Sequence, residues 1–185
     1  MFSEEKVTQM AAYFLLRNDR RLPYIKLIKL LYLAERKAFD KWGTSMSGDR
    51  FVSMPYGPVL SQTYNLIQAH APEDDSPWQS TIKDEANHEV SLIENLDVDD
   101  LDELSRSDCK IMDSVFESYG HMKPFDLVAY THKQCAEWED PQGSSYPIKP
   151  ETIFRALGKN EDQVEKLIEK YREEQALDSI RASLR

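Results

Sequence analysis

Apolar residues recur with a helical period in the first part of the chain. The amino-terminal stretch has the i, i+3, i+4, i+7 spacing of a helix with one buried face, carried by Val7, Met10, Ala11, Phe14 and Leu15. Ser3 is a suitable N-cap, and polar residues place the end of this helix near Asn18. A second run, residues 25–34, is apolar around most of its circumference and follows Pro23. It predicts a buried central helix, with Lys26 and Lys29 extending to water from its least buried edge.

Shorter apolar segments after this helix predict a strand and a turn. Gly43 can end the central helix in a left-handed conformation, and residues 47–49 form a turn signal. Residues 50–54 then predict a strand. The turn at residues 56–58 is expected to end that strand, with Pro58 in the first turn of the next helix.

The second half of the chain predicts a hairpin and then a series of helices. Residues 80–83 and 89–93 flank a polar stretch, which indicates a hairpin that can share a small antiparallel sheet with residues 50–54. The helices that follow are expected to begin at Ser105, Pro124, Pro150 and Asn160, the first of them ending at Gly120, the second near Trp138 and the third at Gly158. Residues 172–185 form a charged, weakly amphipathic extension that frays alone or docks on a partner. The fold class predicted for residues 1–185 is mostly α (α+β), a single compact domain with a small antiparallel sheet or hairpin.

Composition favours a cytoplasmic protein with one core. The 185 residues are 41% hydrophobic, enough for one well-filled core. The chain contains no apolar run of the length that spans a membrane, and its first residues lack the basic and apolar segments of a secretory signal. Cys109 and Cys135 lie too far apart in sequence to suggest a zinc or disulfide framework.

The net charge of −10 is concentrated in the middle of the chain. Residues 67–140 contain 5 Lys and Arg against 19 Asp and Glu, a net charge of −14, whereas residues 1–66 carry +4 and residues 141–185 are neutral. Such a segment repels nucleic-acid phosphates and attracts a basic partner, or else serves only as a solvated acidic face. Binding to nucleic acid is therefore not expected.

The chain shows no set of residues with the spacing of a catalytic or metal site. The four histidines, His70, His88, His121 and His132, are scattered, and the glycines form no phosphate-binding loop. His132 and Cys135 come nearest to a nucleophilic pair, but neighbours three apart on one helix rarely share a cleft with an orienting group. No metal and no cofactor are predicted.

Three stretches resemble the SocA-like Panacea domain of bacterial and phage toxin–antitoxin pairs. They are "KLIKLLYLAER" (residues 26–36), "GDRFVSMPYGPV" (residues 48–59) and "HKQCAEW" (residues 132–138). The residues that carry the resemblance are Leu30, Leu31, Tyr32, Gly48, Asp49, Gly57, Pro58, His132 and Trp138. The resemblance implies an antitoxin that neutralises a cognate toxin, encoded by an adjacent gene, through direct binding. In at least one relative the domain also delivers the toxin to a protease. Homo-oligomerisation is left open.

Three hypotheses follow from the sequence. The first is a non-enzymatic antitoxin whose partner contacts involve Phe51, Tyr56, Trp138, Asp99 and Asp100. The second is a small hydrolase or nucleotide-handling enzyme with a pocket near His132, using Glu137 and the turn at residues 56–58. The third, a DNA-binding phage or module regulator, is disfavoured by the acidic middle segment.

Overall fold

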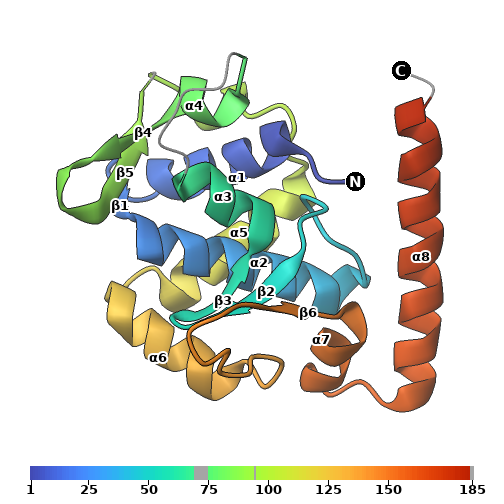
Figure 1. Cartoon of the computed structure of the whole chain (residues 1–185). Helices are drawn as coiled ribbons and strands as arrows, with labels where there is room; N and C mark the ends of the chain where they lie inside the picture. Colours follow the sequence, from blue (N-terminus) through green and yellow to red (C-terminus); the bar gives the residue numbers. More distant parts are fainter. Residues whose placement is uncertain (69–74, 94, 184–185) are drawn as a thin grey trace.

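The computed structural model describes residues 1–68, 75–93 and 95–183 of the chain (Figure 1). The helices in this part are α1 (Glu4–Leu16), α2 (Tyr24–Trp42), α3 (Ser61–Gln68), α4 (Pro77–Thr81), α5 (Arg106–Tyr119), α6 (Pro124–Gln134), α7 (Pro150–Ala156) and α8 (Glu161–Ser183). The strands are β1 (Arg21–Pro23), β2 (Phe51–Met54), β3 (Gly57–Leu60), β4 (Ile82–Glu85), β5 (Glu89–Leu92) and β6 (Tyr146–Ile148), with 3-10 turns η1 (Ala86–His88) and η2 (Val98–Asp100). The predicted class, mostly α (α+β) with a small antiparallel sheet or hairpin, is confirmed, and the described residues form two such sheets rather than one.

The central helix of the fold is α2. Figure 1 shows it running across the middle of the body, and it packs on α1, α5, α6, α7 and β3. Its buried side chains cover most of its circumference between Leu27 and Phe39, as the apolar run predicts. Gly43 ends it with a φ of 74°, the left-handed C-cap that the sequence indicates.

Two three-stranded antiparallel sheets flank the helices. One has the order β1-β5-β4 and the other β3-β2-β6. The predicted hairpin is confirmed, with Ile82 opposite Leu92 and Glu85 opposite Glu89. The prediction that this hairpin shares a sheet with residues 50–54 is wrong, because β2 pairs with β3 and β6 instead.

Three strands that the sequence did not predict, β1, β3 and β6, each contain a proline. Pro58 does not open a helix: it lies in β3 opposite Ser53, and α3 begins only at Ser61. β3 is an edge strand, where a missing N–H costs no ladder bond. Pro23 in β1 and Pro147 in β6 also lie in edge strands of three residues, which are too short to show an alternating pattern.

Most helix starts agree with the sequence, and two helix ends differ. Ser3, Ser105 and Asn160 each accept a hydrogen bond from the backbone three residues on, as N-caps do. α1 ends at Leu16, two residues early, because the chain turns into β1. α6 ends at Gln134 rather than near Trp138, since Cys135 leaves the helical conformation (φ −96°, ψ 84°). The following turn brings Glu137 and Trp138 back towards α2 and β2.

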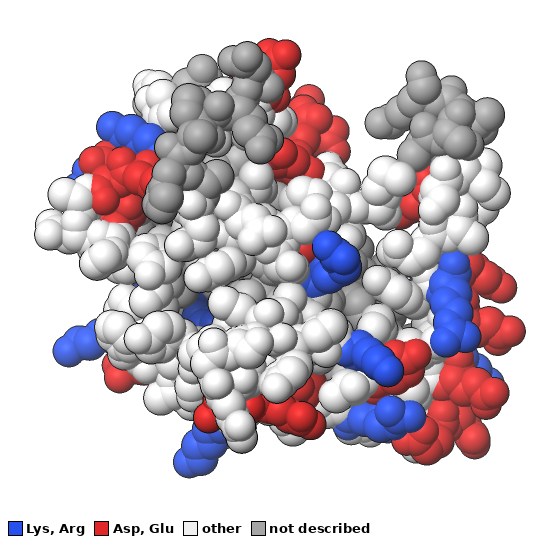
Figure 2. Space-filling model, in the orientation of Figure 1, with Lys and Arg blue, Asp and Glu red and all other residues white. Residues whose placement is uncertain are grey.

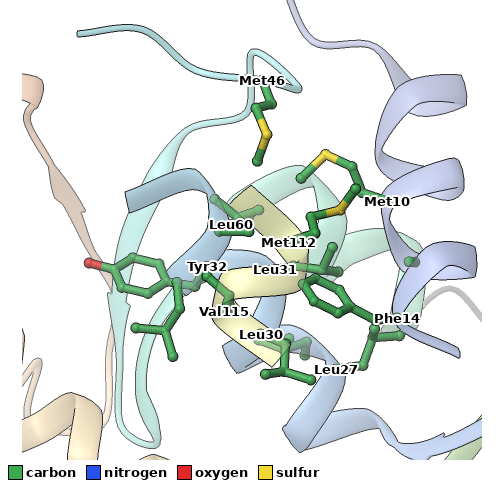
Figure 3. Close-up of a cluster of buried hydrophobic side chains, with 14 of the residues drawn as sticks. Met10, Phe14, Leu27, Leu30, Leu31, Tyr32, Met46, Leu60, Met112 and Val115 are labelled. Carbon is green, nitrogen blue, oxygen red and sulfur yellow. The ribbon is translucent and has the colours of Figure 1, made fainter. Parts of the chain in front are cut away.

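A continuous hydrophobic core surrounds α2 (Figure 3). Leu30, Leu31 and Tyr32 are fully buried there, together with Phe14 of α1 and Met112 of α5. The helix predicted to form the buried centre of the fold therefore does so.

The last helix, α8, runs along one side of the body (Figure 1). Its first half packs inward, with Tyr171 on Phe39 at 5.7 Å between ring centroids and Lys170 donating to the Trp42 carbonyl. Farther along, Leu177 is exposed, and Asp178 pairs with the amino terminus. The partner-docking role predicted for residues 172–185 stays a prediction. No helix in the described ranges combines the length and apolarity needed to cross a bilayer.

Candidate functional site

Polar side chains on α2 connect the three stretches that resemble the Panacea family. Lys29, Tyr32, Glu35 and Arg36 point from this helix to three different segments, and three of them are almost fully buried. Positions 29, 32 and 36 lie on one helical face by the i, i+3, i+7 spacing. We call these four residues and their bonded partners the α2 network.

Glu35 organises the segment that follows α2. Its carboxylate is fully buried and accepts from the Ser45 hydroxyl (2.9 Å), the Met46 N–H (2.8 Å) and both the N–H (2.7 Å) and hydroxyl of Ser47. Burial raises the pKa of Glu35, and the donors from Ser45, Met46 and Ser47 oppose that rise. The carboxylate thus fixes the turn that leads to Gly48 and Asp49.

Asp49 caps α3. One oxygen accepts from the Gln62 N–H (2.9 Å), and the other accepts from the N–H (2.8 Å) and hydroxyl (2.7 Å) of Thr63. Buried amides at a helix start need such an acceptor, and a carboxylate also interacts favourably with the helix dipole. Gly48 has a φ of 73°, and a Cβ there would lie 2.2 Å from the Met1 carbonyl oxygen. These two family residues therefore have structural roles.

Glu137 is a buried acid that accepts hydrogen bonds from two side chains of α2. Its Oε1 accepts from the Tyr32 hydroxyl (2.5 Å) and from Arg36 Nε (2.6 Å), and its Oε2 accepts from the other side of the guanidinium (3.2 Å). Burial and the adjacent carboxylate hold the pKa of Tyr32 well above its usual value. The "HKQCAEW" stretch is thus anchored to the first stretch by a bidentate ion pair.

Lys29 is buried, which contradicts the prediction that it extends to water. It is 1% exposed, and its amine donates to the Pro58 carbonyl at 2.8 Å. Gly57, with a φ of 93°, covers this amine: a Cβ there would lie 2.7 Å from Thr131 Oγ1 and 3.1 Å from Lys29 Nζ. Burial lowers the pKa of Lys29 to about 7. Lys26 is only partly buried and donates to the Gly120 carbonyl.

His132 and Trp138 form a stacked pair beside Lys29. Their rings lie 3.9 Å apart with 9° between planes, and Trp138 Nε1 donates to the Met54 carbonyl at 2.9 Å. Burial, followed by the proximity of Lys29, lowers the pKa of His132. The structure gives His132 and Glu137, the residues of the enzyme hypothesis, different partners: an indole ring for the first, and Tyr32 with Arg36 for the second.

The residues expected to contact a partner differ sharply in exposure. Phe51 is 3% exposed and packs between Phe39 and Tyr32, so its prediction as a surface contact is wrong. Its place on the inner face of β2 explains the difference. Tyr56 is 64% exposed, and Trp138 is half-buried. The sequence did not single out Phe125, which is also 64% exposed and meets Tyr56 edge to face at 6.4 Å.

We call Tyr56 and Phe125 the aromatic pair. Phe125 stands in the first turn of α6, away from the buried stripe of Leu127, Val128 and Thr131, and that offset is the sequence signal that could have revealed it. Figure 2 shows that the surface over α3 and the β2–β3 hairpin is largely uncharged, whereas charged side chains gather on α8 and along the rim. The aromatic pair adds two exposed aromatic rings to the molecular surface.

The acidic segment is only partly available to a partner. Asp99 and Asp100 are exposed in η2, where Asp100 also accepts from the Asp97 N–H at 2.7 Å. By contrast, Asp108 is buried and paired with Lys6, and Glu137 is buried in the α2 network. Part of the −14 charge is therefore neutralised inside the fold.

The described residues offer no arrangement for a metal ion. Across residues 1–68, 75–93 and 95–183, no three His, Cys, Asp or Glu side chains gather as ligands. His70 lies outside the described residues.

Comparison with known protein families assigns the chain to a family. The family model described as "Antitoxin SocA-like, Panacea domain" matches residues 27–139, which include most of α2, both β2 and β3, and the turn after α6. No curated protein and no solved structure matches the chain. The matched residues contain the whole α2 network, from Lys29 to Glu137, and they make up more than half of the sequence. The chain therefore belongs to the SocA-like Panacea domain family of antitoxins.

Proposed function

We propose that this protein is a non-enzymatic antitoxin that neutralises a cognate toxin, encoded by an adjacent gene, by direct binding. Membership of the family supports the antitoxin role. The observation that supports direct binding is the aromatic pair, because Tyr56 and Phe125 each leave 64% of their surface in water and their rings meet edge to face. Exposed aromatic residues of this kind are the usual anchors of protein interfaces.

The aromatic pair is held on rigid elements. Tyr56 sits in the β2–β3 turn, which Lys29 fixes through the Pro58 carbonyl and Trp138 fixes through the Met54 carbonyl. Phe125 is fixed by the first turn of α6. Because the supporting backbone is already ordered, binding a toxin there costs little ordering entropy.

Delivery of the bound toxin to a protease is a second step that the family suggests for the same protein. The half of α8 that includes Leu177 is a separate exposed element for such a contact. It lies beyond the family match, which ends at residue 139.

Co-expression with the product of the adjacent gene tests the proposal. The neighbour alone should arrest growth, the pair should restore it, and the two proteins should co-purify. The double variant Tyr56→Ser with Phe125→Ser should weaken the complex by roughly 2 kcal/mol or more and abolish protection. The control variant is Ile93→Ser, which removes an exposed apolar side chain (49% exposed) just after β5, outside both proposed contact regions. A harmless neighbour, or full protection by the double variant, would contradict the proposal.

A further inference from the structure

A groove of about 510 Å³ lies between the second half of α2 and the first half of α5, two helices that pack on each other. Three lysines line it, Lys37 and Lys41 from α2 and Lys110 from α5. Its apolar lining comes from the buried Ile111 and the half-buried Trp42. Among the described residues, no Asp or Glu lines this groove, whereas the groove between α7 and α8 is lined by side chains of both charges.

The lysines of the groove have no carboxylate partner within the described ranges. The acids closest to them on the two helices are bonded to other cations: Asp40 to Lys159, Asp108 to Lys6, and Asp113 to Arg17. The next acid along α5, Glu117, is exposed and does not line the groove. The Lys37 amine donates to the Ser114 hydroxyl and has further protons to donate, and Lys41 and Lys110 are exposed. The groove therefore concentrates positive charge on a chain whose net charge is −10, and such a cleft attracts anions.

We propose that this groove binds a nucleoside di- or triphosphate, whose phosphates accept from the three lysines and whose base stacks on Trp42. The hydroxyls of Ser107 and Ser114 line the same groove and supply further donors to phosphate oxygens. An indole ring is a stacking surface for any base, whereas the carboxylates of an acidic peptide would use the lysines and leave the indole without a planar partner. The size fits, because sites for small ligands span roughly 300–1,000 Å³.

This site is separate from the proposed toxin surface. The residues that line it belong neither to the aromatic pair nor to the α2 network. The sequence has no glycine-rich phosphate loop, so side chains rather than backbone amides hold the phosphates. Nucleotide binding can therefore hold or fail whatever the result of co-expression with the adjacent gene.

Titration of the full chain with ATP in magnesium-free buffer tests the inference, with calorimetry and tryptophan fluorescence as readouts. We expect one saturable site with a dissociation constant of about 1 mM or lower, and quenching of the indole emission when the base stacks. Inorganic triphosphate carries the same phosphates without the base, and it should bind at least about fivefold more weakly. Raising the salt concentration from about 0.05 M to about 0.2 M should weaken the binding of both ligands several-fold.

Variants of the lysines and of the indole locate the site. Lys41→Gln with Lys110→Gln should lower the affinity for ATP by about tenfold or more, and both positions are exposed, so folding should not be disturbed. The matched control, Lys123→Gln with Lys133→Gln, removes two exposed lysines outside the groove and should change the affinity by less than about twofold. Trp42→Leu should abolish both the quenching and the preference for ATP over triphosphate.

Three outcomes would overturn the inference. Equal affinity for ATP and inorganic triphosphate, or an equal loss of affinity from the two lysine pairs, would show a diffuse attraction of polyanions rather than a nucleotide site. The absence of any binding up to about 10 mM would overturn it as well. If Trp42→Leu fails to fold, the comparison of ATP with inorganic triphosphate still decides whether the base contributes.

Discussion

The α2 network and the aromatic pair use neighbouring residues for opposite purposes. The network lies inside the fold, where Glu35 and Glu137 have their oxygens engaged by donors from other segments. The aromatic pair lies on the surface, where the rings of Tyr56 and Phe125 contact each other and most of each side chain is exposed to solvent. The family stretches meet in the first region. The residues that carry the family resemblance therefore mainly stabilise the fold. The aromatic pair, which we propose as the partner surface, lies on the outside of that fold.

Tyr56 is the point where the two regions meet. Its neighbours Gly57 and Pro58 cover and bond the Lys29 amine, while its own ring faces solvent. Changes inside the network should therefore reduce stability, whereas changes to the exposed aromatics should reduce binding and leave stability nearly intact.

The largest expected effect is loss of the Glu137 carboxylate. Glu137→Ala leaves the partly buried Arg36 guanidinium and the Tyr32 hydroxyl without their acceptor, and should lower the free energy of unfolding by roughly 3–5 kcal/mol. Chemical denaturation monitored by circular dichroism measures this. Glu139→Ala is the matched control, because that side chain is exposed, and its effect should stay within about 0.5 kcal/mol. Equal stability of the two variants would show that the network is not needed for folding.

The next effect concerns the apolar side of the same helix. Leu31 is fully buried, so Leu31→Ala should cost roughly 2–5 kcal/mol, depending on how far the site collapses. Leu177→Ala is the matched control on the exposed part of α8, with an expected change within about 0.5 kcal/mol. A melting midpoint of Leu31→Ala equal to that of the unchanged protein would mean that α2 is not the centre of the core.

The sequence predicted the apolar framework better than the polar one. Helical periodicity located α2 and its burial, because a continuous apolar run has few alternatives. The same run hid the role of Lys29, since a lysine in such a helix usually extends its amine to water. The partners of Glu35 and Glu137 lie 10 to 12 and about 100 residues away along the chain, and no local pattern encodes such contacts. Phe51 was wrongly predicted to be exposed, because the pattern of a strand does not show which of its two faces is covered.

The pH dependence of stability tests the Lys29 environment. The folded-state pKa of about 7 is below the usual value of 10.5, so between these two values the unfolded chain binds more protons and stability should rise with pH. The slope from this group is at most about 1.4 kcal/mol per pH unit, and it disappears below about pH 7. We expect the rise between about pH 7 and 8.5, before the thiols of Cys109 and Cys135, whose pKa values are raised from 9.0, begin to oppose it.

The lysine variants separate this contribution from the rest of the protein. Lys29→Met should flatten the profile of unfolding free energy over that pH window, whereas Lys26→Met should retain most of the slope, because burial lowers the pKa of Lys26 as well but to a smaller extent. A profile of Lys29→Met parallel to that of the unchanged protein would mean that the buried amine keeps its usual pKa.

The smallest expected effect is on the rate at which a partner associates. If the toxin has a basic surface, the exposed carboxylates of Asp99 and Asp100 should attract it, so Asp99→Lys with Asp100→Lys should slow association a few-fold and hardly change dissociation. The effect should fade above about 0.15 M salt, where the Debye length is near 8 Å. Stopped-flow measurements over a salt series give both rates.

A second double charge reversal, placed on α8, distinguishes the effect of the local electric field near η2 from the effect of net charge. Glu165→Lys with Glu169→Lys changes the total charge by the same amount on exposed positions of α8, outside the acidic segment. Equal slowing by both pairs would show that net charge alone sets the encounter rate. No slowing by either pair would assign the acidity to solubility, and the aromatic pair would then be the whole of the recognition surface. Slowing by the Asp99 and Asp100 reversal alone would place the encounter beside η2, so that charge guides the toxin and Tyr56 and Phe125 hold it.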